Sequence, residues 1–537
     1  MIERKENMKR KIAFLLAGIL AAGSLLGGCG KKDSSAEGGE SADGEVTLSF
    51  FDKNSGSNTF DDDVAKAIME KTGVKINVEN PTGDPLEKLN LMLTGQNYPD
   101  IVLMDRGNEI VKRYIDAGAL VDLTDYIDQY PNIKEMYGDT LNKIKYDDGK
   151  NYYLSNWYGE DPEPVAGVLM RYDILCELVG QERADSNEPF TEQEFIDLCK
   201  QFKEKYPEID GKESIAVTLD AESTNYDGTI RGMYGMKNYA QLQDGTISHI
   251  VKDERFPKIV KFMNGLYTEG LLDREWVVNK KEQWKQKLAT GNVFATFCSY
   301  WDVEAANTSL ATTVGEDAQF YSYKVVGEGT NPDETTYSGR STLGWDAIAI
   351  TKNCKNVDAA LKLIDFLASE EGQYLMMWGL EGKTWNMENG VHVPTEEILK
   401  EITTDIDTVK ATYGIRKWTW FIKNGMGSDG TPYDLYSYEK TTTSKIANQH
   451  FGESDRWDTA EFDGITPDGS TPEGLSWQKI QDLYSQAFPQ IVNASSYDEA
   501  MNLYQQLLND MDAAGLSDVE KIFTEKYNAK MELWGEK

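Results

Sequence analysis

The chain has 537 residues, and its 90 Asp and Glu against 55 Lys and Arg give a formal net charge of -35 at pH 7. This length exceeds the size at which one hydrophobic core stops growing, which excludes a single compact domain. The charge repels phosphate backbones and anionic lipid headgroups, and no cluster of Lys or Arg opposes it after residue 32, so nucleic acid is excluded as a partner.

The beginning of the chain has the pattern of a secretory signal. Three basic residues at positions 9–11 precede an apolar run over 12–26 that is too short, and too rich in small residues, for a comfortable membrane span. The run ends in LLGGC, which resembles the bacterial lipobox and whose last residue is Cys29. The pattern predicts a signal peptide over 1–28 and a lipid on Cys29; the alternative is an ordinary signal peptide with a chance cysteine.

A flexible tether is expected over residues 29–45. From Gly30 to Glu45 the chain has almost no apolar side chain, so burial cannot offset the entropy that ordering would cost. The lipid is then the only expected attachment to a membrane. The predicted location is extracytoplasmic, on the outer face of the bacterial cytoplasmic membrane.

Strands and helices alternate between residues 46 and 117. Strands are expected at 46–51, 74–79 and 100–104, where short runs are apolar or β-branched. The helices expected between them are one capped by Ser57 or Thr59 and stopped by Gly73, one from Pro85 to Gly95, and one over 107–117. This alternation predicts an α/β fold with a mostly parallel sheet covered on both faces.

Polar residues follow two of these strands. In open α/β sheets ligands bind beyond the carboxyl ends of the strands, which nominates residues 52–55 and 105–106. From these we select Asn54 and Asp105 as candidate ligand-binding residues. The alternative for Asp52 or Asn54 is a simple helix cap.

A second lobe is expected from residue 157 onward. Glycine, asparagine and two prolines interrupt any long element near residues 149–164, and a new strand begins at 168–170. Helices are then expected at 191–206 and 256–269, and strands at 292–297 and within 342–350. Residues 354–379 have the apolar periodicity of one long amphipathic helix.

The cysteines and histidines indicate no metal chemistry. The four cysteines after Cys29 form no C-x-x-C pair, and the three histidines form no H-E-x-x-H motif, so neither a metal site nor another cofactor is expected. Buried free thiols are expected, and a disulfide between Cys176 and Cys199 is the alternative.

Several motifs in chain order resemble those of the extracellular solute-binding proteins of bacterial ABC sugar importers, the superfamily of maltose-binding protein. They are similar above all to its long-chain branch, whose members bind oligosaccharides or other saccharide-like solutes. The segments that carry the resemblance are LNLMLTGQNYPDIVLMD, AGALVDLTDYID, GNVFATFCSYWDVEA, LGWDAIAITKNCKNVDAALKLIDFLASEEGQ, WGLEGKTW and GLSDVEKIFTEKYNAKMELWG. Relatives in this branch often carry a calcium loop, but residues 206–213 are too short and lack the ligand spacing, so no calcium site is expected.

The resemblance implies a monomeric type II binding protein and not an enzyme. Its fold would be two α/β lobes joined by a hinge, with the ligand captured in a cleft between them and delivered to the permease subunits of an ABC importer. By analogy, lobe 1 takes residues 46–156 and 345–395, and lobe 2 takes 157–344 and 396–537.

A sugar site needs aromatic rings to stack on C–H faces and polar groups to bind hydroxyls. Trp301 is the preferred candidate, because the family segment that matches CSYWDVEA places a Trp against the sugar; its alternative role is packing between helix and sheet. The other candidates are aromatic residues and the polar residues beside them: Asn156, Trp157, Tyr300, Asp302, Trp345, Asp346, Trp385, Trp418 and Trp420.

Two other functions compete with sugar binding. A binding protein for a peptide or another polar solute would share the fold. A charged ligand would, however, require a residue of opposite charge among the candidates. A secreted glycoside hydrolase would share the aromatic residues and would need two carboxylates at a set separation, which a count of acidic residues does not exclude.

Overall fold

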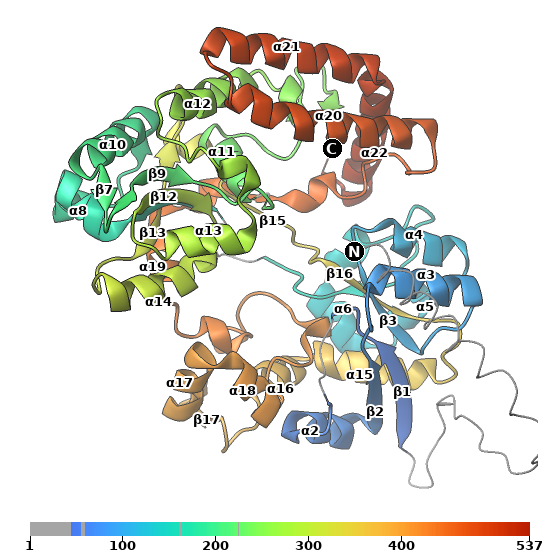
Figure 1. Ribbon diagram of the computed structural model, residues 1–537. Helices are drawn as coiled ribbons and strands as arrows, with labels where there is room; N and C mark the ends of the chain where they lie inside the picture. Colours follow the sequence, from blue (N-terminus) through green and yellow to red (C-terminus); the bar gives the residue numbers. More distant parts are fainter. Residues whose placement is uncertain (1–44, 55–58, 161–163, 165, 224, 537) are drawn as a thin grey trace, which may run out of the picture. The chain divides into compact units, whose positions relative to one another are not determined.

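The computed structural model describes residues 45–54, 59–160, 164, 166–223 and 225–536 (Figure 1). The first sheet has the strand order β2-β1-β3-β16-β4, in which β1 is parallel to β2 and β3, and β16 is antiparallel to β3 and β4. These strands are β1 (Val46–Phe51), β2 (Val74–Glu79), β3 (Ile101–Asp105), β4 (Leu154–Ser155) and β16 (Asp346–Ile350). The α/β class predicted from the sequence is confirmed.

Helices cover both faces of this sheet. Successive strand residues alternate between two cores: Leu103 packs with residues of α2 (Asp63–Thr72) and α15 (Val357–Ala368), whereas Val102 packs with residues of α3 (Pro85–Gly95) and α4 (Glu109–Asp116). In Figure 1, α3 and α4 accordingly lie on one side of β3 and α15 on the other. This explains why the strand 101–105 is apolar along almost its whole length.

The first helix begins later than predicted. Thr59 does not cap it, and Ser57 lies outside the described residues; the cap is Asp62, whose carboxylate accepts from the backbone N–H of Ala65 at 2.9 Å. Phe60, expected on the helix, precedes it and packs against the ring of Trp418. Gly73 ends the helix in the left-handed conformation, as predicted.

The second sheet has the order β13-β5-β12-β9 and carries its own helices. Its strands are β5 (Gly167–Arg171), β9 (Ile215–Thr218), β12 (Val293–Cys298) and β13 (Phe320–Tyr323). One face packs against α10 (Glu192–Lys205) and α12 (Phe256–Thr268), and the other against α13 (Lys281–Leu288) and α14 (Glu304–Thr313). These bounds agree within a few residues with those predicted from periodicity.

The remaining elements are short connections and a C-terminal group of long helices. The long helices are α20 (Pro472–Val492), α21 (Tyr497–Ala513) and α22 (Leu516–Trp534), which contribute to the core that contains α12. The other helices are α5 (Thr124–Ile127), α6 (Pro131–Tyr137), α7 (Thr140–Lys143), α8 (Tyr172–Val179), α9 (Gln181–Ala184), α11 (Asn225–Met233), α16 (Glu370–Trp378), α17 (Glu396–Thr404), α18 (Ile406–Tyr413) and α19 (Thr442–His450). The short strands are β6 (Phe190–Thr191), β7 (Glu208–Ile209), β8 (Lys212–Glu213), β10 (Ala240–Gln241), β11 (Ile247–Ser248), β14 (Val325–Val326), β15 (Ser338–Arg340), β17 (Trp385–Glu388), β18 (Val391–Pro394) and β19 (Arg456–Asp458). Single 3₁₀ turns occupy Ile250–Lys252, Trp276–Val278, Tyr300–Val303, Pro332–Glu334, Thr419–Phe421, Leu435–Ser437, Glu453–Asp455 and Thr459–Phe462.

The predicted long helix over 354–379 is wrong in one respect, because it is two helices, α15 and α16. Ser369 has an extended backbone, and its hydroxyl accepts from the N–H of Gly372 at 3.1 Å, which caps α16. A Cβ on Gly372 would lie 2.0 Å from the carbonyl oxygen of Phe366, so the tight break requires glycine. The apolar periodicity continues through the break, so the periodicity alone did not reveal that the helix ends there.

The core of the first lobe extends further along the chain than the predicted boundary at residue 395. Buried side chains from Ile398 to Leu435 pack in the same cluster as Leu48 and Ile348 of the first sheet. Residues 396–435 therefore belong with lobe 1, whereas the analogy placed them in lobe 2. The chain next enters the second core at Phe451.

The cysteines that the structure describes are free thiols, so the alternative disulfide between Cys176 and Cys199 is wrong. Cys29, the signal segment and most of the tether lie outside the described residues. Among the residues that are described, no helix combines the length and the apolar character needed to cross a bilayer.

A polar cluster stabilises the small region around the β17–β18 hairpin. The carboxylate of Asp429 accepts hydrogen bonds from the N–H of His392 at 2.7 Å, the N–H of Thr431 at 2.9 Å and the hydroxyl of Tyr374 at 2.9 Å. Burial by itself raises the pKa of Asp429, but the hydrogen bonds from His392 and Thr431 outweigh it and hold this pKa well below its usual range.

Asp429→Asn should therefore lower the free energy of unfolding by about 2 kcal/mol at pH 7, because the charge-assisted hydrogen bonds are lost. The lowered pKa makes the contribution of Asp429 complete above its unfolded-state pKa of about 4 and smaller at lower pH. Denaturant unfolding at pH 7 and pH 3.5 should show the gap between wild type and variant narrowing in acid. A gap that stays constant would contradict the prediction.

Candidate functional site

The carboxyl ends of β1 and β3 and the first residue of β16 meet at one edge of the first sheet. Lys53 follows β1, Asp105 ends β3, and Asp346 begins β16 directly opposite Asp105. The ammonium of Lys53 lies 2.6 Å from Oδ1 of Asp105 and 3.0 Å from Oδ1 of Asp346. The strand-end reasoning thus nominated Asp105, and the structure joins it to Asp346, a candidate chosen on other grounds.

The three charged groups differ in burial. The side chain of Asp346 is buried, whereas that of Asp105 is 61% exposed. Burial raises the pKa of Asp346 above its usual value, although Lys53 and Asn156 act in the opposite direction. Burial lowers the pKa of Lys53, but its hydrogen bonds and attraction to both carboxylates outweigh this and raise the pKa, so the ammonium is protonated at neutral pH.

Asn156 completes this arrangement from the next segment of chain. Its Nδ2 donates to Oδ2 of Asp346 at 2.9 Å, and its Oδ1 accepts from the N–H of Asp346 at 3.2 Å. Gly344 packs directly on the same segment with φ +67°, and a Cβ there would lie 1.6 Å from the carbonyl oxygen of Asn156. Two segments far apart in sequence are therefore held in backbone contact.

Two tryptophans project from these two segments. The rings of Trp157 and Trp345 stack with centroids 5.7 Å apart and planes at 21°. Trp345 is 53% exposed, whereas Trp157 is partly buried, and the guanidinium of Arg416 lies over its ring at 5.6 Å. The backbone of Trp157 is fixed by an N–H bond to the carbonyl of Ile422 at 2.7 Å. Trp345 is thus the exposed member of a supported aromatic stack.

Arg416 and Tyr436 were missed by the sequence reasoning. Arg416 also lies 5.3 Å from the ring of Tyr436, which is partly exposed, and pairs with Asp434 at 3.1 Å. Arg416 stands only two residues before Trp418 in the segment RKWTW, but no local pattern distinguished it from other surface arginines. Its backbone has φ +61°, which is uncommon for a residue other than glycine.

Trp301 follows β12 of the second lobe and is also exposed, at 40%. Its ring meets that of Tyr300 edge-on at 4.9 Å, and the guanidinium of Arg340 lies over it at 5.6 Å. Asp302 is partly buried. Trp301 and Trp345 therefore both present exposed aromatic surface.

Three candidate tryptophans lie in the core of the first lobe instead. Trp418 is 1% exposed, and Trp385 and Trp420 are also buried. The indole N–H of Trp420 donates to Asp52 at 3.3 Å. With no ring face exposed, these residues are not part of our candidate site.

Asn54 is exposed and is held in a local turn. Its N–H donates to the carboxylate of Asp52 at 2.9 Å, and its carbonyl oxygen accepts from Asn80 at 2.9 Å. Asp52 thus organises the residues after β1 through the backbone of Asn54. The side chain of Asn54 stays a candidate only by its place at the strand end.

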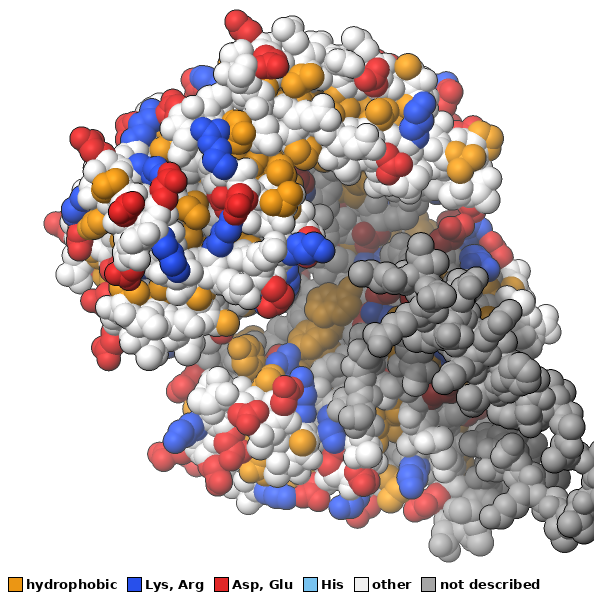
Figure 2. All heavy atoms as spheres, viewed as in Figure 1, with side chains coloured by type: hydrophobic (Ala, Val, Ile, Leu, Met, Phe, Trp, Pro, Cys, Tyr) orange, Lys and Arg blue, Asp and Glu red, His pale blue; other side chains and the backbone are white. Residues whose placement is uncertain are grey.

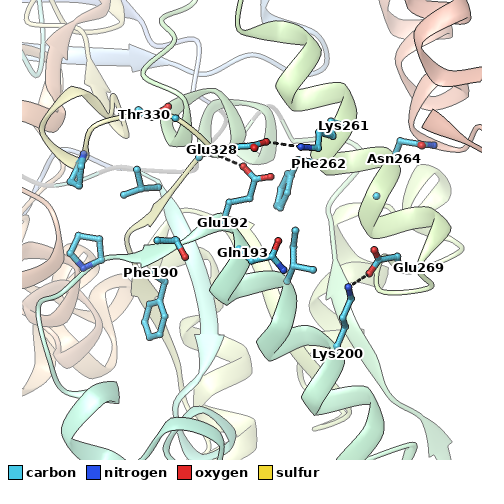
Figure 3. Close-up of a pocket in the computed structure, with 18 of the residues that line it drawn as sticks. Phe190, Glu192, Gln193, Lys200, Lys261, Phe262, Asn264, Glu269, Glu328 and Thr330 are labelled. Atoms are coloured by element: carbon cyan, nitrogen blue, oxygen red, sulfur yellow. Dashed lines mark hydrogen bonds and ion pairs between the residues drawn. The ribbon is translucent and has the colours of Figure 1, made fainter. Parts of the chain in front are cut away.

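A separate groove of about 920 Å³ lies between α10, α12 and residues 326–332. Figure 3 shows Glu192 in this groove, where it accepts from the N–H of Glu328 at 2.7 Å. Ion pairs join Lys261 to Glu328 at 2.7 Å and Lys200 to Glu269 at 2.6 Å. Because these charges are already paired within the walls, we place the candidate site at the strand ends and exposed tryptophans.

The surface chemistry agrees with the composition. Figure 2 shows acidic side chains spread over the viewed face with basic ones between them. Within the described ranges, no cluster of His, Cys, Asp and Glu has the arrangement to hold a metal ion.

A comparison of the sequence with protein families decides the family. The profile described as "Bacterial extracellular solute-binding protein" matches residues 63–382, more than half of the chain. The chain belongs to the bacterial extracellular solute-binding protein family. The resemblance inferred from the sequence motifs is therefore confirmed.

This solute-binding protein has relatives of known name. The polygalacturonan/rhamnogalacturonan-binding protein YtcQ of Bacillus subtilis (strain 168) is 26% identical over 460 residues, which are 83% of this chain and 88% of YtcQ. The fructooligosaccharide ABC transporter substrate-binding protein FusA of Streptococcus pneumoniae serotype 4 (strain ATCC BAA-334 / TIGR4) is 24% identical over 411 residues, 69% of this chain and 71% of FusA.

Solved structures support the fold of this solute-binding protein. The HMO-binding, ABC-transporter-associated solute-binding protein of Bifidobacterium longum infantis ATCC 15697 has a TM-score of 0.68 at 18% identity, with 90% of this chain and 99% of that chain covered. At this identity the likeness concerns the fold alone. The predicted two-lobed type II fold is confirmed.

Proposed function

We propose that the chain is a substrate-binding lipoprotein that captures a saccharide, specifically an oligosaccharide, outside the cell and delivers it to an ABC importer. The observation that carries this proposal is the Trp345 ring, which is 53% exposed although it is one of the largest apolar side chains. Exposed aromatic surface beside polar groups is typical of ligand sites. Trp157 supports the ring, and the exposed carboxylate of Asp105 lies at the same sheet edge.

The chemistry of this site suits a sugar. An indole face stacks on the C–H groups of a pyranose, and a carboxylate accepts hydrogen bonds from its hydroxyls. The site combines both kinds of group, and Trp301 of the second lobe adds another exposed ring. The names of YtcQ and FusA, which describe carbohydrate binding, support the same proposal.

A thermal-shift screen against a glycan panel tests the proposal. A saccharide present at 100 times its dissociation constant should stabilise the protein by about 2.7 kcal/mol, which is a measurable rise in melting temperature. Solution scattering of the same complex should show a smaller radius of gyration, because a ligand held by both lobes favours a closed state. No response to any saccharide, combined with a response to peptides, would replace this proposal with a peptide-binding function.

The family is one of binding proteins, and we propose no catalytic role for the chain. The panel assay gives a direct check, because a glycoside hydrolase would release shorter products from the oligosaccharides during incubation. Unchanged oligosaccharides are the expected result.

We also propose that the chain is anchored by a lipid on Cys29. The support is the apolar run that ends in LLGGC, together with the basic residues before it. Cys29→Ser should move the expressed protein from the membrane fraction to the soluble fraction, because lipoproteins carry at least two acyl chains, enough for stable anchoring. Fractionation and immunoblotting measure this. Cys176→Ser, which changes a free thiol far along the chain, is the control and should stay with the membrane. A membrane-bound Cys29→Ser protein would contradict the anchor.

A further inference from the structure

Lys53 holds together two carboxylates that would otherwise repel each other. Asp105 and Asp346 are directly opposite in the antiparallel pair of β3 and β16, and like charges in such positions are destabilising. Lys53 reaches both, at 2.6 Å and 3.0 Å. Oδ1 of Asp346 is buried and has no well-oriented hydrogen bond. Attraction to the Lys53 ammonium therefore offsets the cost of burying this charge.

This ion cluster fixes the backbone beneath the aromatic stack. Asp346 follows Trp345 in the chain, and Arg106, which follows Asp105, donates its N–H to the carbonyl of Trp345 at 2.8 Å. The guanidinium of Arg106 also donates to the carbonyl of Gly344 at 2.7 Å and 2.9 Å. The Trp345 ring therefore depends on the same strand ends that Lys53 joins.

The cluster also sets the local charge. One ammonium and two carboxylates leave one negative charge, and the exposed member is Asp105, at 61%. The nearby cations do not reverse this, since Arg416 pairs with Asp434 at 3.1 Å and Arg106 with Asp463 at 2.6 Å. A ligand carboxylate beside Asp105 would meet repulsion, whereas a hydroxyl would donate to it.

We infer that Lys53 is a positioning residue that fixes Asp105 beside the Trp345 stack, so that this part of the site accepts the hydroxyls of an uncharged sugar and disfavours sugar carboxylates. The selection of an uncharged sugar rests on the proposed function. The positioning by Lys53 does not, because it concerns the unliganded protein.

Circular dichroism of the unliganded protein tests the positioning. Stacked indoles give an exciton couplet in the far ultraviolet, and Trp345→Phe defines the share that comes from the Trp157–Trp345 pair. Lys53→Met should remove most of the couplet that comes from this pair. Without the Lys53 ammonium, the carboxylates of Asp105 and Asp346 repel each other. Lys53→Arg keeps the charge and should retain the couplet. A Lys53→Met spectrum equal to that of wild type would overturn the positioning, whatever its melting temperature.

Binding of two trisaccharides tests the selection. Isothermal titration with maltotriose and with trigalacturonic acid should favour the neutral sugar in the wild type. Asp105→Asn should weaken maltotriose by about tenfold, because a charge-assisted hydrogen bond becomes a neutral one. Asp105→Asn should also reduce the ratio of the affinity for maltotriose to the affinity for trigalacturonic acid. The selection would be overturned if the wild type bound trigalacturonic acid more tightly than maltotriose and Asp105→Asn kept the same preference. No binding of either sugar would overturn the selection. The glycan panel tests the proposed function, and circular dichroism tests the positioning.

Discussion

Gly344→Ala should lower the stability of the first lobe by about 3 kcal/mol or more, since the new methyl group combines backbone strain with a collision. The residue has φ +67°, and the added Cβ would lie 1.6 Å from the carbonyl oxygen of Asn156. Neither the carbonyl nor the neighbouring strand end has room to move, because Asn156 is bonded to Asp346 on both its amide atoms. Denaturant unfolding measures the change.

Gly382→Ala is a matched control for this substitution. Gly382 has φ +78°, but no atom lies within 4 Å of the position that its Cβ would take, so its replacement carries only the conformational cost of about 1–2 kcal/mol. The difference between the two variants therefore isolates the collision with Asn156. Equal losses in both variants would mean that the segments around Asn156 and Gly344 do not lie in contact.

Trp345→Ala should reduce the affinity for the bound saccharide by tenfold to a hundredfold or more. Stacking contributes on the order of 1 kcal/mol beyond area burial, and covering one face of the ring adds about 2 kcal/mol. Because Trp345 is 53% exposed, its truncation should change the melting temperature of the unliganded protein little. Trp301→Ala should behave in the same way, since its ring is 40% exposed.

Trp418→Ala is the contrasting variant for this experiment. Trp418 is 1% exposed in the core, so its truncation should cost about 3–5 kcal/mol of stability and leave the affinity of the folded protein unchanged. Titration calorimetry and thermal unfolding of the three variants measure both quantities. A large stability loss with unchanged affinity for Trp345→Ala would show that this ring is a packing residue.

The regular elements of the first lobe could be predicted because their signals are local. The strands 46–51 and 74–79 have the predicted bounds, and Gly73 and Pro85 punctuate the helices as expected. The break at Ser369 could not be predicted from apolar spacing, because it depends on a side-chain cap and on a contact between Gly372 and Phe366. A break of this kind can be detected in a sequence only when helix-capping residues are considered before the apolar periodicity.

The kinds of residue in the candidate site could be predicted from the sequence, but which individual residues belong to it could not. A tryptophan beside a polar residue is the same pattern at Trp345 and at Trp420, yet one is exposed and the other buried in the core. Burial depends on which distant segments pack together. This is also why Lys53 was not selected from the nominated residues 52–55, and why Arg416 was missed. Their partners are 52 or more positions away for Lys53 and 18 positions away for Arg416.

The return of residues 396–435 to the first core has a consequence for the order in which the chain can fold. The β1–β4 portion of lobe 1 emerges first during synthesis, but its sheet lacks β16, and its core lacks the side chains from Ile398 to Leu435. The second core is completed only by residues near the carboxyl end, such as Phe523. The first core can therefore close only after residues 398–435 have been made, and the second only after the C-terminal helices, so long-range contacts must form late. A chain built in this way is suited to crossing a membrane unfolded, before either core closes.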